Sequence, residues 1–383
     1  MKVYLDNAAT TPVHPKVLEK MLPFLKESFG NPSSIHSFGR SVRVAIEEAR
    51  ENVADFINAD ASEIYFTSSG TEALNFAILG MSRTIRDENG KSKIVTGANE
   101  HYAVIESFKA LDKEGFDTHF IDSKYNGEID YDELKENSEG AALISVMHVN
   151  NVLGSINNLS SVRKLAGESN AFFHTDAVQS FGKIKIDVNE IGCHALCASG
   201  HKLNGPKGIG MAYIKSETPI APMMLGGSQE RSRRGGTENV AGIIGFSEAV
   251  NLIRENIDYK FDYASKLKNR LITGLRSIDK AGIIINCLDN STPHICSVTL
   301  SEEYYNNDAE AMLMYLDING VAVSGGAACT SGTLKPSHAV LAIGHSKNNA
   351  AGTFRFSFGA QNRDEEIDYT LEVLKKMTDK FRK

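Results

Sequence analysis

Short apolar runs alternate with amphipathic helical stretches through the first half of the chain, and this alternation constrains the fold more than any other feature. The segment Glu63–Thr67 has the pattern of a strand and is followed by a helical stretch. The same order recurs after the apolar runs Ile94–Val95, Ala141–Met147 and Phe172–His174. Repeated strand–helix units predict an α/β fold with a mainly parallel sheet covered by helices on both faces.

Polar residues and glycines stand where these strand-like runs end. Ligands bind at the carboxyl ends of the strands in open parallel sheets, so residues that share this position predict one composite site. The turn at Gly70 also leaves free backbone N–H groups at the start of a helix, which favours an anion there, although an ordinary capped turn is the alternative. The residues chosen by this position are Gly70, Thr71, His101, Asn151, Asp176, Gln179 and Ser199.

The stretch Ser199–Gly210 places a lysine just past the buried strand-like run Ala195–Ala198. A lysine amine has an ordinary pKa of about 10.4, so it is nearly all protonated at neutral pH. A lysine amine that is sequestered from water is less protonated and therefore suits covalent chemistry, which makes Lys202 a candidate nucleophile. Two alternatives stay open from the residues alone: Lys202 is a solvated turn lysine, or Lys207 is the reactive one.

The second half of the chain predicts a smaller α+β unit. A long helical stretch from Asn239 to about Ile278 precedes short strand-like segments, of which Phe354–Phe358 alternates most clearly. The glycine-rich segment Ser324–Pro336 lies between them and is predicted as a loop. We therefore expect a large cofactor-binding domain over residues 14–255 and a small domain over residues 1–13 and 256–383.

Composition narrows the possible partners and the setting. The 383 residues carry a formal net charge of -7, which argues against nucleic acid as a partner. No segment of about 20 apolar residues is present, so we expect no membrane span, and no signal-peptide pattern opens the chain. Five scattered cysteines do not suggest a disulfide framework, and a cytoplasmic setting is expected.

Four of the cysteines are predicted to be structural. Cys193 and Cys197 are expected on one face of a strand, and a zinc site there is disfavoured because the ligands would not converge. Cys287 and Cys296 sit among apolar strand residues and are predicted to lie in the core.

Taken together, these motifs resemble the NifS/IscS-like cysteine desulfurases, which are class V, fold-type I pyridoxal-phosphate (PLP) enzymes. The resemblance runs from Tyr4–Ala9 to Phe354–Gly359, almost the whole chain, and it rests on many separated motifs in one order. It implies the fold-type I PLP-transferase architecture, bound PLP and a homodimer. It also implies an enzyme that converts L-cysteine to L-alanine.

The resemblance implies a role for each candidate residue. Lys202 corresponds to the catalytic lysine that holds PLP covalently, and Asp176 to the carboxylate that keeps the pyridine nitrogen protonated. His101 corresponds to a catalytic histidine stacked on the ring, and Arg355 to the arginine that grips the substrate carboxylate. The other implied contacts are Gln179 to the phenolic oxygen, Asn151 to cofactor and substrate, Gly70, Thr71, Ser199 and His201 to the phosphate, and Thr237 to the phosphate across the dimer interface.

Cys329 decides the subclass, because the family's sulfur-accepting cysteine corresponds to this position. Its neighbours in Ser324–Gly332 are glycines and small residues, which suit a mobile loop carrying a thiol. The resemblance implies that Cys329 becomes a persulfide and passes sulfur to an acceptor or iron–sulfur scaffold protein. It also implies that Cys329 is a possible transient ligand of an iron–sulfur cluster shared with that scaffold. The expected end products are iron–sulfur clusters or other thio-cofactors.

The sequence departs from the family at two places. Val152 stands where the family usually has Glu, and the chain ends at Lys383, without the tail that helps longer members dock a scaffold. The alternatives are a selenocysteine lyase or another class V C–S lyase, and a non-catalytic assembly platform. A platform would be expected to have lost Lys202, Asp176 or Cys329, and all three are present.

Overall fold

The computed structural model describes residues 1–325, 327–330 and 333–383, without side-chain placement for residues 327–330 and 333–335. Its larger sheet has seven strands in the order β2-β8-β7-β6-β5-β3-β4. The strands are β2 (Ile64–Thr67), β3 (Lys93–Gly97), β4 (Asp117–Ile121), β5 (Leu143–Ser145), β6 (Phe172–Asp176), β7 (Ala195–Ser199) and β8 (Gly210–Ile214). Only the pairs that involve β8 are antiparallel within this sheet. The predicted mostly parallel sheet is therefore confirmed.

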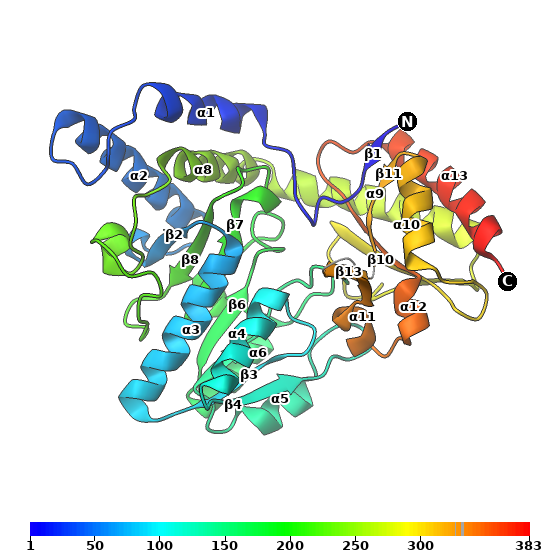
Figure 1. Ribbon diagram of the computed structural model, residues 1–383, viewed down its shortest axis with the longest axis horizontal. Coiled ribbons are helices and arrows are strands. Elements are labelled where there is room, and N and C mark those ends of the chain that lie inside the picture. The colour runs from blue at the N-terminus through cyan, green and yellow to red at the C-terminus, as the bar shows by residue number, and fades with distance from the viewer. Residues whose placement is uncertain (326, 331–332) are drawn as a thin grey trace.

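Two sets of helices bury the two faces of this sheet (Figure 1). Because side chains alternate along a strand, Phe66 faces one layer while its neighbour Tyr65 faces the other. The layer at Tyr65 consists of α3 (Gly70–Asn89) and α4 (Tyr102–Lys113). The layer at Phe66 includes α2 (Ser37–Phe56), α5 (Tyr131–Ser138), α6 (Leu159–Ser169), α7 (Val188–Ile191) and α8 (Val240–Arg254), with α1 (Pro15–Lys26) packed on α8.

A second, antiparallel sheet forms the core of the C-terminal half. Its order is β12-β15-β10-β9, from β9 (Ile283–Ile285), β10 (Ile295–Leu300), β12 (Ser324–Gly325) and β15 (Thr353–Ser357). The helices of this half are α9 (Ile257–Ile278), α10 (Ala309–Ile318), α11 (His338–Ala342), α12 (Lys347–Ala351) and α13 (Asp364–Phe381). The predicted smaller α+β unit is present, with α9, α10 and α13 packed together.

The glycine-rich segment predicted as one loop contains short strands. Besides β12, its backbone forms a hairpin of β13 (Ala327–Thr330) and β14 (Thr333–Pro336), in which Cys329 is opposite Leu334. Glycine and small residues lower strand propensity, but pairing between the two arms satisfies their backbone groups.

The N-terminus belongs structurally to the C-terminal half. Strand β1 (Val3–Tyr4) pairs in parallel with β11 (Val321–Ala322), so both chain ends lie at the same side of the molecule (Figure 1). The chain then crosses to the large sheet through residues 6–11, which we call the crossing segment. The separate sheets and hydrophobic cores support the division at residues 14–255, which we keep as a proposal.

A buried ion pair holds the segment that leads to Thr237. Arg50, 1% exposed, donates from its two terminal nitrogens to the two carboxylate oxygens of Glu230 at 2.7 and 2.9 Å. Glu230 also accepts from the Phe66 amide at 2.9 Å, which ties it to the edge strand β2. Glu230, Arg231 and Ser232 all have positive φ, a conformation that needs such outside support.

No helix among the described residues has both the length and the apolar character required to cross a membrane.

Candidate active site

The strand ends bring most of the sequence-predicted residues together. Asp176 ends β6 and Ser199 ends β7, while Gly70 begins α3 and His101 caps α4. Charge interactions link His101, Asp176 and Lys202, so these three side chains lie close to one another. Residues that directly follow strand-like runs in the sequence therefore lie close together at the strand ends of the fold.

Lys202 follows β7 in a short 3-10 turn and points at the crossing segment. Its Nζ donates to the main-chain oxygens of Ala8 at 2.6 Å and Ala9 at 2.8 Å. Burial, with nearby Arg355, lowers the pKa of Lys202 to about 8, although Asp6 and Asp176 act in the opposite direction. About one amine in ten is then neutral at pH 7. The rival Lys207 is exposed.

Burial shifts the pKa values of both Asp176 and His101. Burial raises the pKa of the Asp176 carboxyl, and His101 and Lys202 partly oppose this; its Oδ1 accepts from the Val178 amide at 2.8 Å. Burial lowers the pKa of His101, partly opposed by Asp176. The Nδ1 of His101 accepts from the Ala103 amide at 3.1 Å, so the neutral ring carries its proton on Nε2.

The start of α3 forms a cradle for an anion. Within the described residues, the backbone N–H groups of Gly70 and Thr71 donate to no protein acceptor. A Cβ added at Gly70 would lie 2.9 Å from Val178 and 3.2 Å from Ser199, so only glycine fits here.

His201 lies beside Thr10 of the crossing segment. Burial, with Lys202, lowers the pKa of His201 to about 4, so the ring is neutral, and its Nδ1 lies 3.2 Å from the Thr10 hydroxyl.

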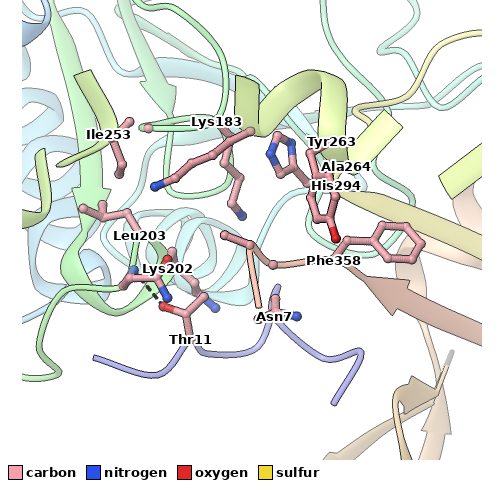
Figure 2. Close-up of a pocket in the computed structure, with 15 residues that line it drawn as sticks. Asn7, Thr11, Lys183, Lys202, Leu203, Ile253, Tyr263, Ala264, His294 and Phe358 are labelled. Carbon is pink, nitrogen blue, oxygen red and sulfur yellow. Dashed lines mark hydrogen bonds between the residues drawn. The ribbon is translucent and has the colours of Figure 1, made fainter. Parts of the chain in front are cut away.

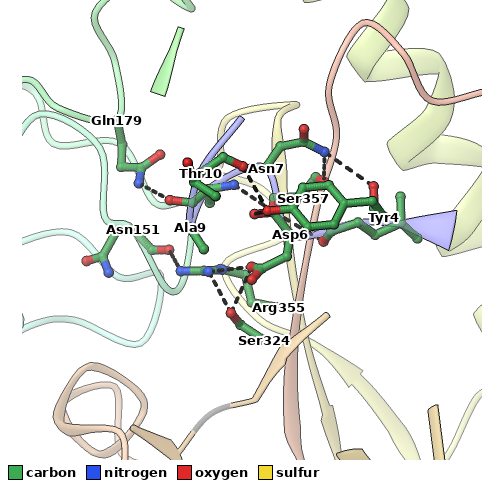
Figure 3. Close-up of polar contacts among 12 residues, drawn as sticks. Tyr4, Asp6, Asn7, Ala9, Thr10, Asn151, Gln179, Ser324, Arg355 and Ser357 are labelled. Carbon is green, nitrogen blue, oxygen red and sulfur yellow. Dashed lines mark hydrogen bonds and ion pairs between the residues drawn. The ribbon is translucent and has the colours of Figure 1, made fainter. Parts of the chain in front are cut away.

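Arg355 comes from β15 and connects three segments (Figure 3). Its Nη1 donates to the main-chain oxygen of Asn151 at 2.8 Å, while Nη2 donates to Asp6 at 2.7 Å and to Ser324 at 2.8 Å. Its Nε is buried without a partner among the described residues. The Asn151 amide points away from the guanidinium in this view. Among the described residues, Arg355 therefore keeps its Nε–H and one N–H of Nη1 without a partner.

The side-chain amide of Gln179 is held between a hydrogen-bond acceptor and a hydrogen-bond donor. Its Nε2 donates to the main-chain oxygen of Ala8 at 2.9 Å, and its Oε1 accepts from Lys183 at 2.9 Å.

Sequence reasoning gave no role to Lys183, Asp6 or Ser324, or to the crossing segment. A polar run of small residues after the first strand was the available signal, but it did not indicate which main-chain oxygens face the site.

Thr237 is the predicted residue, among those whose side chains are described, that a single copy of the chain does not bring into this site. Thr237 is exposed, near Ser68 and Arg234, with Arg234 paired to Glu72 in the first turn of α3 at 2.8 Å. The side chain of Cys329 lies outside the described residues, as does the cluster-ligand prediction made for it. Within the residues that are described, no group of three or more His, Cys, Asp and Glu side chains could hold a metal.

The four remaining cysteines are buried and free, as predicted, but the expectation for one pair was wrong. Cys197 packs in the layer with α3 and α4, whereas Cys193 packs in the opposite core. The reason is that β7 begins only at Ala195, after the left-handed turn at Gly192, so strand alternation does not extend to Cys193.

Val152, which stands where the family usually has Glu, is half-buried and packs beside Leu153 against α11 and α12.

The residues present fit PLP. The glycine-bounded start of α3 suits a phosphate, and a buried carboxylate at Asp176 suits a protonated ring nitrogen. The partly neutral amine of Lys202 suits an aldehyde, because its hydrogen-bond partners are two main-chain oxygens, which leave the amine able to react.

Comparisons with known proteins agree with this geometry. The model of the family "Aminotransferase class-V" matches residues 3–370. Cysteine desulfurase IscS of Dictyoglomus turgidum is 43% identical over 385 residues, covering 100% of this chain and 95% of that protein. Putative cysteine desulfurase IscS 1 of Bacillus subtilis is 40% identical over 383 residues, covering 98% and 100%.

Solved structures show the same likeness. A NifS-like protein superposes with a TM-score of 0.91 at 33% identity, covering 100% of both chains. The structure of SspA in complex with cysteine gives a TM-score of 0.81 at 32% identity, covering 93% of this chain and 99% of that one. The fold-type I architecture is therefore confirmed, and the chain belongs to the aminotransferase class-V family, within its NifS/IscS-like cysteine desulfurases.

Proposed function

We propose that this protein is a PLP-dependent cysteine desulfurase that converts L-cysteine to L-alanine and keeps the sulfur on Cys329 as a persulfide. The observation that carries the proposal is Lys202, a half-buried lysine with a lowered pKa that lies near Asp176. Supplying sulfur for iron–sulfur clusters or other thio-cofactors, through an acceptor or scaffold protein, is the finer part of the proposal. The name IscS of the relatives supports that part.

In this proposal, each of the predicted side chains has a role in binding the cofactor or the substrate. Lys202 holds the cofactor covalently, Asp176 faces its ring nitrogen, and His101 stacks on the ring. Gln179 meets the phenolic oxygen, and Asn151 contributes to the cofactor and substrate positions. The phosphate is held by Gly70, Thr71, Ser199 and His201. PLP supplies the electron sink for the pair left on the substrate Cα.

The reaction balances without an outside oxidant. The neutral amine of Lys202 accepts the proton from the substrate Cα, which its lowered pKa makes available near neutral pH. The thiolate of Cys329 forms an S–S bond with the substrate sulfur as the C–S bond breaks. A proton is returned to the carbon, so L-cysteine plus thiol gives L-alanine plus persulfide.

The first prediction concerns the reactive amine. Borohydride reduction of the PLP-loaded protein should label Lys202, and the Lys207→Arg variant should be labelled as the wild type is. Because the pKa of Lys202 is lowered, the rate of PLP capture by the cofactor-free protein should rise with pH and level off above about 8. A rate that still rises at pH 10, or a label on Lys207, would contradict the assignment.

The second prediction concerns the substrate carboxylate, for which we propose Arg355. Its Nε, which has no partner among the described residues, supports this role. Arg355→Lys keeps the charge but loses the planar fork, so KM for cysteine should rise roughly tenfold, about 1.4 kcal/mol of binding. Steady-state kinetics measures this, with the exposed Arg363→Lys as control. An unchanged KM would remove Arg355 from substrate binding.

The third prediction tests the desulfurase reaction itself. Cys329→Ser should still bind PLP, with its visible absorption band, but should release almost no alanine from cysteine, because a hydroxyl is a poor thiophile. Cys287→Ala is the control, since burial raises the pKa of that thiol to about 12 and makes it inert. Near-full alanine production by Cys329→Ser would favour a C–S lyase that needs no cysteine.

We further propose a homodimer in which Thr237 reaches the phosphate of the second copy. Large exposed apolar side chains gather on α1, on the start of α2 and on the loop before Thr237; Ile35 is 90% and Leu225 82% exposed. Figure 1 shows α1 and α2 at the end of the molecule away from both termini. The other exposed members are Leu18, Leu22, Leu25, Phe29, Phe38 and Met224. A second copy of the chain would cover such a surface.

The fourth prediction follows from this surface. Leu225→Glu should sediment as a monomer and should bind PLP about tenfold more weakly, since a hydrogen bond to a charged phosphate is lost. Ile318→Glu, on the exposed side of α10 in the other half, should leave both properties unchanged. A wild-type protein that is a fully active monomer would refute the shared site.

A further inference from the structure

Lys183 is a half-buried lysine that the proposed reaction does not use. It lines a cavity of about 50 Å³ between the two halves, together with Lys202, Lys260 and His294 (Figure 2). None of the described residues that line this cavity is a carboxylate. Burial, followed by the charges of Lys202 and Arg355, lowers the pKa of Lys183 to about 7. A charged group in such a place needs a specific reason to be there.

The side-chain contact made by Lys183 is with Gln179. Its Nζ donates to Gln179 Oε1 at 2.9 Å, while the Nε2 of the same amide donates to Ala8 O at 2.9 Å. A protonated lysine can only donate and a carbonyl can only accept, so these two neighbours favour a single orientation of the amide when Lys183 is charged. The second N–H of Nε2 then has no partner among the described residues.

The backbone that carries Lys183 is rigid. Its amide donates to Ser180 O at 2.9 Å, and the preceding Gly182 has a φ of +73°. A Cβ at Gly182 would approach Ile253 of α8 to 2.8 Å, so this turn packs closely on the helix below it. The donor is therefore held at a fixed place relative to Gln179, which is 4% exposed.

We propose that Lys183 is a positioning residue that orients and polarises the Gln179 amide, so that its free N–H faces the phenolic oxygen of the cofactor. The inference rests on the proposed function, because it assumes PLP at this site. A cation bonded to the amide oxygen withdraws electron density and strengthens the N–H as a donor. A stronger donor stabilises the anionic phenolic oxygen and lowers the proton affinity of the bound cofactor.

The test is the pH midpoint of the visible absorption change of the PLP-loaded protein, measured in a double-mutant cycle. Lys183→Met, which is neutral and of similar length, should raise the midpoint by about half a pH unit or more, whereas Lys183→Arg, which keeps donor and charge, should shift it less. In a Gln179→Ala background, Lys183→Met should change the midpoint by less than half of its effect in the wild type.

Several outcomes would overturn the inference. An equal shift in both backgrounds would mean that Lys183 acts by direct charge, alongside Lys202, Arg355 and Lys260, and not through Gln179. No shift in Lys183→Met, with unchanged thermal unfolding, would mean that the contact is structural. If wild-type protein shows no visible band with PLP, the proposed function itself fails, which is a separate result.

Discussion

The crossing segment, residues 6–11, is the constraint on which the rest of the site depends. On one side, Asn7 and Ala8 bond to Ser357 of the small sheet at 2.8 Å each. On the other side, the Thr11 amide donates to His201 O at 2.9 Å, and Lys202 donates to Ala8 O. This short stretch of main chain, with its turn at residues 7–9, thus links the strand that carries Arg355 to the 3-10 turn that carries Lys202. A shift of this stretch would move both charged groups relative to each other.

This arrangement also explains how several cations share a poorly hydrated space. Arg355 is neutralised by Asp6, which accepts a hydrogen bond from it at 2.7 Å, so the guanidinium does not stand uncompensated beside Lys202. Burial, followed by the charge of Arg355, still lowers the pKa of Lys202 to about 8.

The sequence predicted the parts of the fold that follow from local pattern. Alternating strands and helices identified the parallel sheet, and strand ends identified Asp176, Ser199 and the start of α3, because parallel topology places these ends at one edge. The roles at Arg355, Thr237 and Cys329 came from the resemblance to a family. The crossing segment, Lys183 and the placement of Cys193 could not be found, because they depend on long-range contacts and on where a strand begins. A run such as Asp6–Thr11 has no periodicity from which its partners could be deduced.

The crossing segment has a consequence for biosynthesis. Asn7 leaves the ribosome well before its hydrogen-bond partner, because the carbonyl that it bonds belongs to Ser357, 350 residues later. At typical translation rates of about 5 to 20 residues per second, the segment waits roughly 20 to 70 s for that partner. The large sheet, which ends at Ile214, can form during this wait, but the pocket around Lys202 is closed only when the final strand has been made. A nascent chain that has not yet reached Ser357 therefore lacks the closed pocket around Lys202.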